Sequence, residues 1–161
     1  MRRAVTFIRE LVPRSAIALV ARLAYNEPYR ALRMRHQIER ASSASGATVQ
    51  VGYEWTGALG RAGIHLSADG EPCPLRAGSL EEFITEHYWG YTRQRDGTTV
   101  EYEVRHPSWR VWNASSARLH GGLTDVFPSP FAAVLDRPPD CAFLAEGSPV
   151  AVHAPVRVSP R

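Results

Sequence analysis

Alternation of apolar and polar residues is the dominant pattern along the chain, and it predicts a protein built mainly of β-strands. Between Arg30 and Glu39 every second residue is apolar or histidine, a period of two that is typical of a half-buried strand. The same period recurs over residues 49–55 and 62–66. Residues 88–95 and 98–106 flank the dipeptide Asp96-Gly97, which suits a tight turn with positive φ, so we expect a β-hairpin there.

Two segments depart from this period and predict helices. Residues 15–25 are almost wholly apolar, so we expect a helix with most of its circumference buried. Ser79 followed by Glu82 forms a capping box that predicts the start of a second helix. The full pattern indicates seven to nine short strands and two or three helices, and the short turns favour antiparallel pairing. The expected fold class is α+β, mainly antiparallel β, with a curved sheet or barrel.

Length and composition are typical of one globular domain. The chain has 161 residues, of which 44% are hydrophobic, and no repeat or internal boundary is visible, so we expect a single domain over residues 1–161. Cys73 and Cys141 are too few for a disulfide framework, which favours a reducing, cytoplasmic location. No apolar stretch is long enough for a membrane-spanning helix, so we expect no membrane association.

The basic residues are all arginine, and this restricts the available chemistry. The nineteen arginines give a net charge of +3, but they are interleaved with acidic residues and form no nucleic-acid motif, so we expect no nucleic-acid partner. Exclusive arginine use with much alanine is typical of the codon bias of a GC-rich bacterial genome. The lack of lysine excludes Schiff-base chemistry through a lysine side chain.

The six histidines do not form a local metal-binding motif. No HxH, HxxxH or CxxC pair occurs, so the sequence predicts neither a metal site nor a cofactor. His36, His87 and His106 fall on apolar faces, where a buried ring needs a hydrogen-bond partner. The remaining three, His65, His120 and His153, are interpreted as surface or loop residues.

The richest cluster of chemical groups runs from Glu86 to Tyr91, where a predicted helix leads into a strand. Glu86 and His106 are candidates for an acid/base pair, with His87 as a further catalytic candidate. An aromatic seam that only packs and forms hydrogen bonds is the alternative interpretation. Arg9 is a candidate for holding a ligand carboxylate, and a surface ion pair is the alternative for that side chain.

Several runs together resemble a known family. They are residues 7–14, 25–29, 78–92, 106–109 and 145–150. These runs resemble the YqjF-like family of domains of unknown function, which is grouped by fold with acetoacetate decarboxylase. The resemblance implies an acetoacetate-decarboxylase-like barrel with a pocket. It also implies that the chain corresponds to the C-terminal two-thirds of the family's domain, with an N-terminal portion missing. The decarboxylase reaction depends on a lysine, so that activity is not implied here.

These observations lead to three functional hypotheses. The first is an uncharacterised protein that binds a small acidic or carbonyl-bearing ligand in a barrel pocket. The second is a lysine-independent acid/base enzyme on such a molecule, and the third is a non-catalytic interaction protein, with a homo-oligomer left open as a partner. The expected ligand-binding residues are Arg9, Tyr88, Tyr91 and Trp109.

Overall fold

The structure is a computed structural model that describes residues 3–44, 46–135 and 137–158. Within them the chain forms twelve strands, three α-helices and one π-helix, which confirms an α+β protein made mainly of strands. The chain divides into two compact units that alternate along the sequence. Unit 1 comprises residues 1–31, 75–109 and 147–161, and unit 2 comprises residues 32–74 and 110–146. The expectation of one domain over the whole chain stays a prediction.

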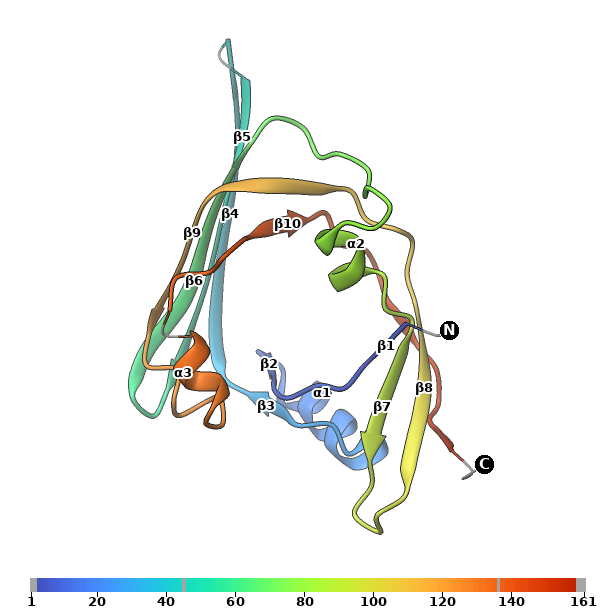
Figure 1. The fold of residues 1–161 in the computed structure, drawn as a ribbon. Coiled ribbons are helices and arrows are strands. Elements are labelled where there is room, and N and C mark those ends of the chain that lie inside the picture. The colour runs from blue at the N-terminus through green and yellow to red at the C-terminus, as the bar shows by residue number, and fades with distance from the viewer. Residues whose placement is uncertain (1–2, 45, 136, 159–161) are drawn as a thin grey trace. The chain divides into compact units, whose positions relative to one another are not determined.

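Unit 2 is a curled antiparallel sheet that forms a half-barrel, in the strand order β10-β9-β6-β5-β4 (Figure 1). Its members are β4 (Arg33–Ser43), β5 (Gly46–Gly57), β6 (Gly60–Asp69), β9 (Val111–Gly121) and β10 (Phe143–Ala145), with the short helix α3 (Phe131–Leu135). The three strands predicted from residues 30–39, 49–55 and 62–66 are thus confirmed as β4, β5 and β6, but β4 begins only at Arg33, because residues 30–31 belong to the separate strand β3 (Tyr29–Ala31).

The core of unit 2 lies on one face of this sheet. Val51 on β5 pairs with Leu66 on β6, and Val49 pairs with Ala68, so all four side chains share a face. Trp112 on β9 completes this buried cluster, and its Nε1–H donates to the Gly70 carbonyl at 3.0 Å. The residues between these positions are polar and point to the opposite face, which is exposed.

Unit 1 contains the remaining elements. They are β1 (Ala4–Val5), β2 (Glu10–Val12), α1 (Ser15–Val20), the π-helix η1 (Ala21–Tyr25), β3 (Tyr29–Ala31), α2 (Leu80–Thr85), β7 (Trp89–Arg93), β8 (Thr99–Arg105), β11 (Ala151–Val152) and β12 (Val156–Arg157). The hairpin β7–β8 is the centre of its larger sheet, with β1 beside β7 and both β11 and β12 beside β8, while β2 and β3 form a parallel pair.

Two local predictions in unit 1 are confirmed. The β7–β8 hairpin turns at Asp96-Gly97, where Gly97 has φ 85° and the Asp96 carboxylate accepts from the Thr98 N–H at 3.0 Å. Helix α2 begins after Ser79, whose hydroxyl accepts from the Glu82 N–H at 3.2 Å. The Glu82 carboxylate in turn accepts from the Gly78 N–H at 2.8 Å, one residue earlier than a standard capping box places it.

The predicted burial of the first helix is wrong. The helical segment itself is confirmed from Ser15 to Tyr25, but only Ala18 in it is buried. Leu19 is 58% exposed and Leu23 is 70% exposed. The apolar composition of this segment indicated burial on all sides, whereas α1 and η1 in fact contribute one wall of a pocket.

Candidate functional site

A pocket of about 520 Å³ lies within unit 1, and its lining is mostly apolar. Its apolar lining includes Phe7, Ile17, Val20, Val104, Val150 and Val152. Its polar lining comprises Glu27 and three tyrosines, Tyr25, Tyr29 and Tyr102. A largely apolar pocket of this size with a few polar groups is typical of a site for a small organic molecule.

The carboxyl group of Glu27 is the central polar feature of this pocket. Glu27 is only 4% exposed, and its Oε1 accepts hydrogen bonds from the Tyr102 hydroxyl at 2.7 Å and from the Thr92 hydroxyl. Its Oε2 is buried and has no hydrogen-bond partner among the described residues. Since buried polar atoms are nearly always paired, an unpaired carboxyl oxygen on a residue that lines a pocket is a candidate position for a hydrogen bond from a ligand.

The end of the π-helix places Glu27 at this position. Asn26 adopts a left-handed conformation with φ 57°, which ends η1 and turns the chain toward β3. The Asn26 side-chain amide donates to the Arg93 carbonyl at 2.8 Å, and Gln94 donates to the Tyr25 carbonyl at 3.0 Å. Both bonds tie the turn to the end of β7, the strand that also carries Thr92.

A glycine on β7 makes room for the tyrosine that holds Glu27. Gly90 pairs with Tyr102 across the hairpin, and a Cβ at position 90 would lie 2.2 Å from Cζ of that tyrosine. The Tyr102 ring therefore lies across the strand at Gly90 and reaches Glu27 on the far side. Tyr25 packs its ring edge against Tyr102, with 5.1 Å between the ring centres.

Burial and negative charge shift the acid–base properties of the groups around Glu27. Burial, followed by the hydrogen bond to Glu27, raises the pKa of Tyr102 far above its usual value, so this tyrosine remains a hydrogen-bond donor. Burial and the charges of Glu10 and Glu27 raise the pKa of Tyr29 to about 12. Burial, with a smaller effect of Glu27, also raises the pKa of Glu10.

Four of the residues singled out from the sequence meet in a second cluster of unit 1. His106 stacks between Tyr88 and Trp109, with ring centres 5.0 Å and 4.2 Å away. The Tyr88 hydroxyl donates to Glu86 Oε2, a hydrogen bond that raises the pKa of Tyr88 to about 12. The Trp109 Nε1–H donates to the Ser148 hydroxyl at 2.9 Å. This cluster therefore has the features of the predicted aromatic seam, and the catalytic role of Glu86 and His106 stays a prediction.

The other three candidates lie outside this cluster. Arg9 donates through Nη1 to the Pro28 carbonyl at 3.4 Å. The Nδ1 of His87 donates to the Ile84 carbonyl at 2.9 Å, and its ring lies edge-on to Phe83. The Tyr91 hydroxyl donates to Glu101 at 2.9 Å. None of the seven candidates is among the residues that line the Glu27 pocket.

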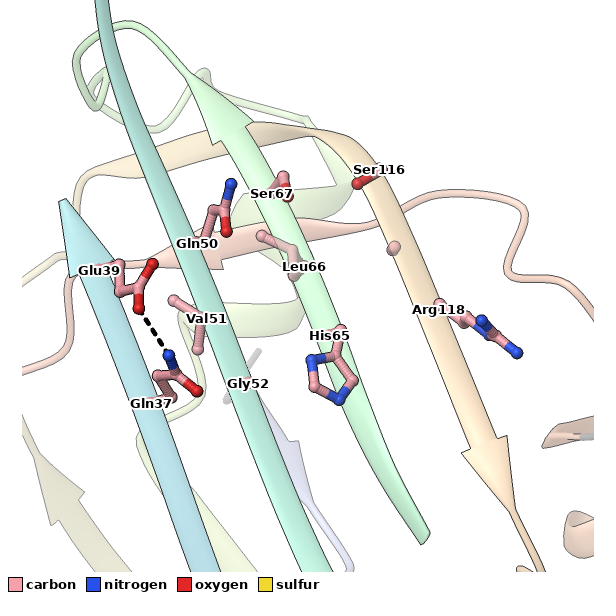
Figure 2. A pocket seen from close by; sticks show the side chains of 11 residues that line it. Gln37, Glu39, Gln50, Val51, Gly52, His65, Leu66, Ser67, Ser116 and Arg118 are labelled. Atoms are coloured by element: carbon pink, nitrogen blue, oxygen red, sulfur yellow. Dashed lines mark hydrogen bonds between the residues drawn. The ribbon is translucent and has the colours of Figure 1, made fainter. Parts of the chain in front are cut away.

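The polar face of the unit 2 sheet carries a further depression of about 380 Å³ (Figure 2). On β4, Gln37 donates to Glu39 at 2.5 Å. His65 on β6 and Arg118 on β9 are paired in the register of those two neighbouring strands. His65 lies over β5 at Gly52, where the missing side chain leaves space for the imidazole ring.

Sequence reasoning missed Glu27 and did not bring His65 and His120 together, although His65 is a surface residue as expected, with 53% of its side chain exposed. The two histidines lie on strands β6 and β9, and the structure brings their rings together with Glu54. In the sequence, Asn26-Glu27-Pro28 indicates only the end of a helix. Its partners come 65 and 75 residues later, so no local motif could have revealed them.

Comparisons with known proteins place the chain in a family. The geometry describes an α+β protein with a pocket large enough for a small molecule. The family to which the chain belongs is uncharacterised, so it indicates no activity. The model of the DUF2071 family, described as an uncharacterised conserved protein (COG2071), matches residues 1–149, so the chain belongs to this family. No curated protein and no solved structure matches the chain. Within the described residues, no helix has the length and apolar character needed to cross a membrane.

Proposed function

We propose that the unit 1 pocket binds a small, mainly apolar molecule that carries a hydroxyl or amine group. The observation that carries this proposal is the buried, unpaired Oε2 of Glu27, a residue that lines a pocket whose other lining is mostly apolar. A ligand that donates one hydrogen bond to this oxygen and buries its apolar part against Phe7, Ile17 and Val104 satisfies both features.

The same geometry argues against a ligand that is an anion. A carboxylate in the pocket would approach the carboxyl group of Glu27, and like charges in an apolar site repel one another strongly. The hydroxyl groups of Tyr102 and Thr92 already donate to Glu27. We therefore prefer a donor-bearing ligand to the acidic or carbonyl-bearing one expected from the sequence, and we keep the latter as an outcome of the test.

The test is a series of thermal melts of the full chain with four ligand classes of similar size: phenols or alcohols, amines, carboxylic acids and keto acids. We expect the melting temperature to rise with an alcohol or an amine, since a ligand that binds only the native state stabilises it. Stabilisation by carboxylic or keto acids alone would overturn the donor assignment. The absence of any shift across the panel would overturn ligand binding.

The matched variants are Glu27→Gln and Glu39→Gln. With its amide oxygen on Tyr102 and Thr92, a glutamine at position 27 turns its NH₂ toward the cavity, so the preference should change from donors to acceptors. The same substitution at Glu39, on the exposed face of unit 2, should leave the ligand preference of the wild type unchanged.

A proton-transfer enzyme is a second candidate function. It is favoured by a carboxyl oxygen that has no partner among the described residues and belongs to Glu27, a residue that lines a pocket of about 520 Å³. The second cluster offers a similar group, because Glu86 Oε1 is also buried without a partner among the described residues. Turnover that is lost in Glu27→Gln and retained in Glu86→Gln would assign the reaction to the pocket, and the reverse result would assign it to the aromatic cluster.

Other expectations from the sequence stay predictions. The acetoacetate-decarboxylase-like barrel remains a proposal for the architecture, and a lysine Schiff base is not part of it because the chain has no lysine. A bacterial, cytoplasmic protein and a homo-oligomer are likewise proposals. Sedimentation of the purified chain tests the oligomer, and fractionation of the source cells tests the location.

A further inference from the structure

Three side chains on the polar face of unit 2 converge on one point. Glu54 on β5 and His120 on β9 both pair with Gly63 on the intervening strand β6, so all three positions lie in one row across the sheet. His65 lies two residues beyond Gly63 on the same strand and therefore on the same face. His65 therefore lies beside the space that Gly63, which has no side chain, leaves between Glu54 and His120.

The glycine at the centre of this row is what allows the convergence. Neighbouring strands are about 4.8 Å apart, so the backbones of Glu54 and His120 are separated by about 9.6 Å. A Cβ at position 63 would lie 2.9 Å from His120 Nε2 and 3.3 Å from Glu54 Cγ. The two side chains thus lean over Gly63 from opposite sides and occupy the space that any other residue there would fill.

The distances between the potential ligand atoms are close to those of a metal site. One nitrogen from each imidazole and one oxygen of Glu54 all lie within 4.8 Å of one another, and the Nε2 of His65 is 3.9 Å from Oε1 of Glu54. The two rings are stacked at 5.2 Å with 22° between their planes. Ligands at about 2.0–2.1 Å from a tetrahedral zinc ion are about 3.4 Å apart, so small side-chain rotations complete the geometry.

From this convergence we propose that Glu54, His65 and His120 bind a divalent transition-metal ion such as Zn²⁺ or Co²⁺. Two imidazoles with one carboxylate suit zinc, cobalt, nickel or iron, whereas magnesium and calcium prefer all-oxygen sites. Three protein ligands also leave a coordination position open to water or to a bound molecule. Side-chain exposures of 42% for Glu54 and 53% for His65 make this position accessible from solvent.

The surroundings of the site indicate what would occupy that open position. Arg35 pairs with Glu54 in the sheet register, Arg118 pairs with His65, and Arg61 lies two residues before Gly63 on the same face. These positive charges weaken the binding of a bare cation and favour a metal that carries an anionic ligand. An anionic group on the metal is therefore part of the proposed site, and phosphate is the probe for it.

The direct test is titration of the full chain, produced without a polyhistidine tag, with CoCl₂ and separately with ZnCl₂. We expect one equivalent of Co²⁺ to give the visible absorption of a low-symmetry complex, and ZnCl₂ to displace it. His65→Ala and His120→Ala should each weaken binding at least about tenfold, and Glu54→Gln should have an effect of the same kind. Phosphate should strengthen binding to the wild type.

The control is His36→Ala. His36 is a strand residue of the same sheet, on the opposite face, with its ring 5.9 Å from that of Tyr53, and its removal should leave metal binding unchanged. Circular dichroism melts establish that each variant is folded. His65 is largely exposed, so His65→Ala decides the question even if His120→Ala fails to fold. No binding at about 1 mM metal, or equal binding by His65→Ala and His36→Ala, would overturn the proposal.

Discussion

The two units bury different kinds of side chain. The interior cluster of unit 2 consists of apolar residues from three neighbouring strands, including Val51, Leu66 and Trp112. In unit 1 the buried side chains include Glu27, Thr85 and Thr92, while the apolar residues of α1 and η1 are largely exposed. Apolar burial stabilises a fold without needing specific partners, whereas a buried carboxyl group must be held by hydrogen bonds. The difference indicates that unit 2 is stabilised mainly by apolar packing, whereas the interior of unit 1 depends on hydrogen bonds to a buried carboxyl group.

The largest effect should come from the core of unit 2. Trp112→Ala removes a buried indole and leaves a cavity, so we expect the free energy of unfolding to fall by about 3–5 kcal/mol. Urea denaturation followed by far-UV circular dichroism measures this loss. Leu23→Ala in unit 1, at a side chain 70% exposed, should change the stability by less than about 0.5 kcal/mol. Similar losses of unfolding free energy in Trp112→Ala and Leu23→Ala would contradict the difference in apolar burial between the two units.

The polar interior of unit 1 should respond to the loss of a single hydroxyl. Tyr102→Phe keeps the ring but removes the donor to Glu27, so we expect a loss of about 1.5–3 kcal/mol, the range for hydrogen bonds to charged groups. Tyr53→Phe is the matched control, because that ring in unit 2 is 39% exposed and should tolerate the change. A Tyr102→Phe variant as stable as Tyr53→Phe would mean that the hydrogen bond to Glu27 does not hold the site.

A smaller effect is expected at the start of α2. Ser79→Ala removes the acceptor for the Glu82 N–H and should cost about 1 kcal/mol of stability. Ser79→Asp retains a capping oxygen and should remain close to the wild type. Thermal melts of the three proteins under identical conditions make the comparison, and equal losses in both variants would show that something other than the cap is responsible.

The smallest effect concerns pH and the partly buried carboxyl group of Glu10. Its pKa is raised above the ordinary 4.5 by burial first and by Glu27 second, so folding favours its protonated form. The stabilising contribution is therefore complete below about pH 4.5 and is lost as the pH rises through the raised pKa. Glu10→Gln should be more stable than the wild type at pH 7, and melts from pH 4 upward should show the difference vanish in acid. A difference in melting temperature between the two proteins that is the same at every pH would contradict the raised pKa of Glu10.

Local patterns predicted the strands and their turns, because those features depend on neighbouring residues. The alternation in β4, β5 and β6, the Asp96-Gly97 turn and the Ser79 cap are each contained in a few consecutive residues. The Glu27 site and the Glu54–His65–His120 site depend instead on register between distant strands. The prediction that α1 is buried on all sides was wrong for a related reason, because apolar side chains can line an open pocket as well as a core.

The alternation of the two units along the chain has a consequence for how the protein is made. Strands β4, β5 and β6 follow one another and can pair as soon as the ribosome has released them. Strand β9 completes the next ladder only after α2, β7 and β8 have been synthesised. During that interval the edge of β6 is an open template for pairing with another chain. Slow elongation between residues 70 and 110 should therefore increase aggregation of the nascent protein, whereas in the finished chain β9 covers the edge of β6.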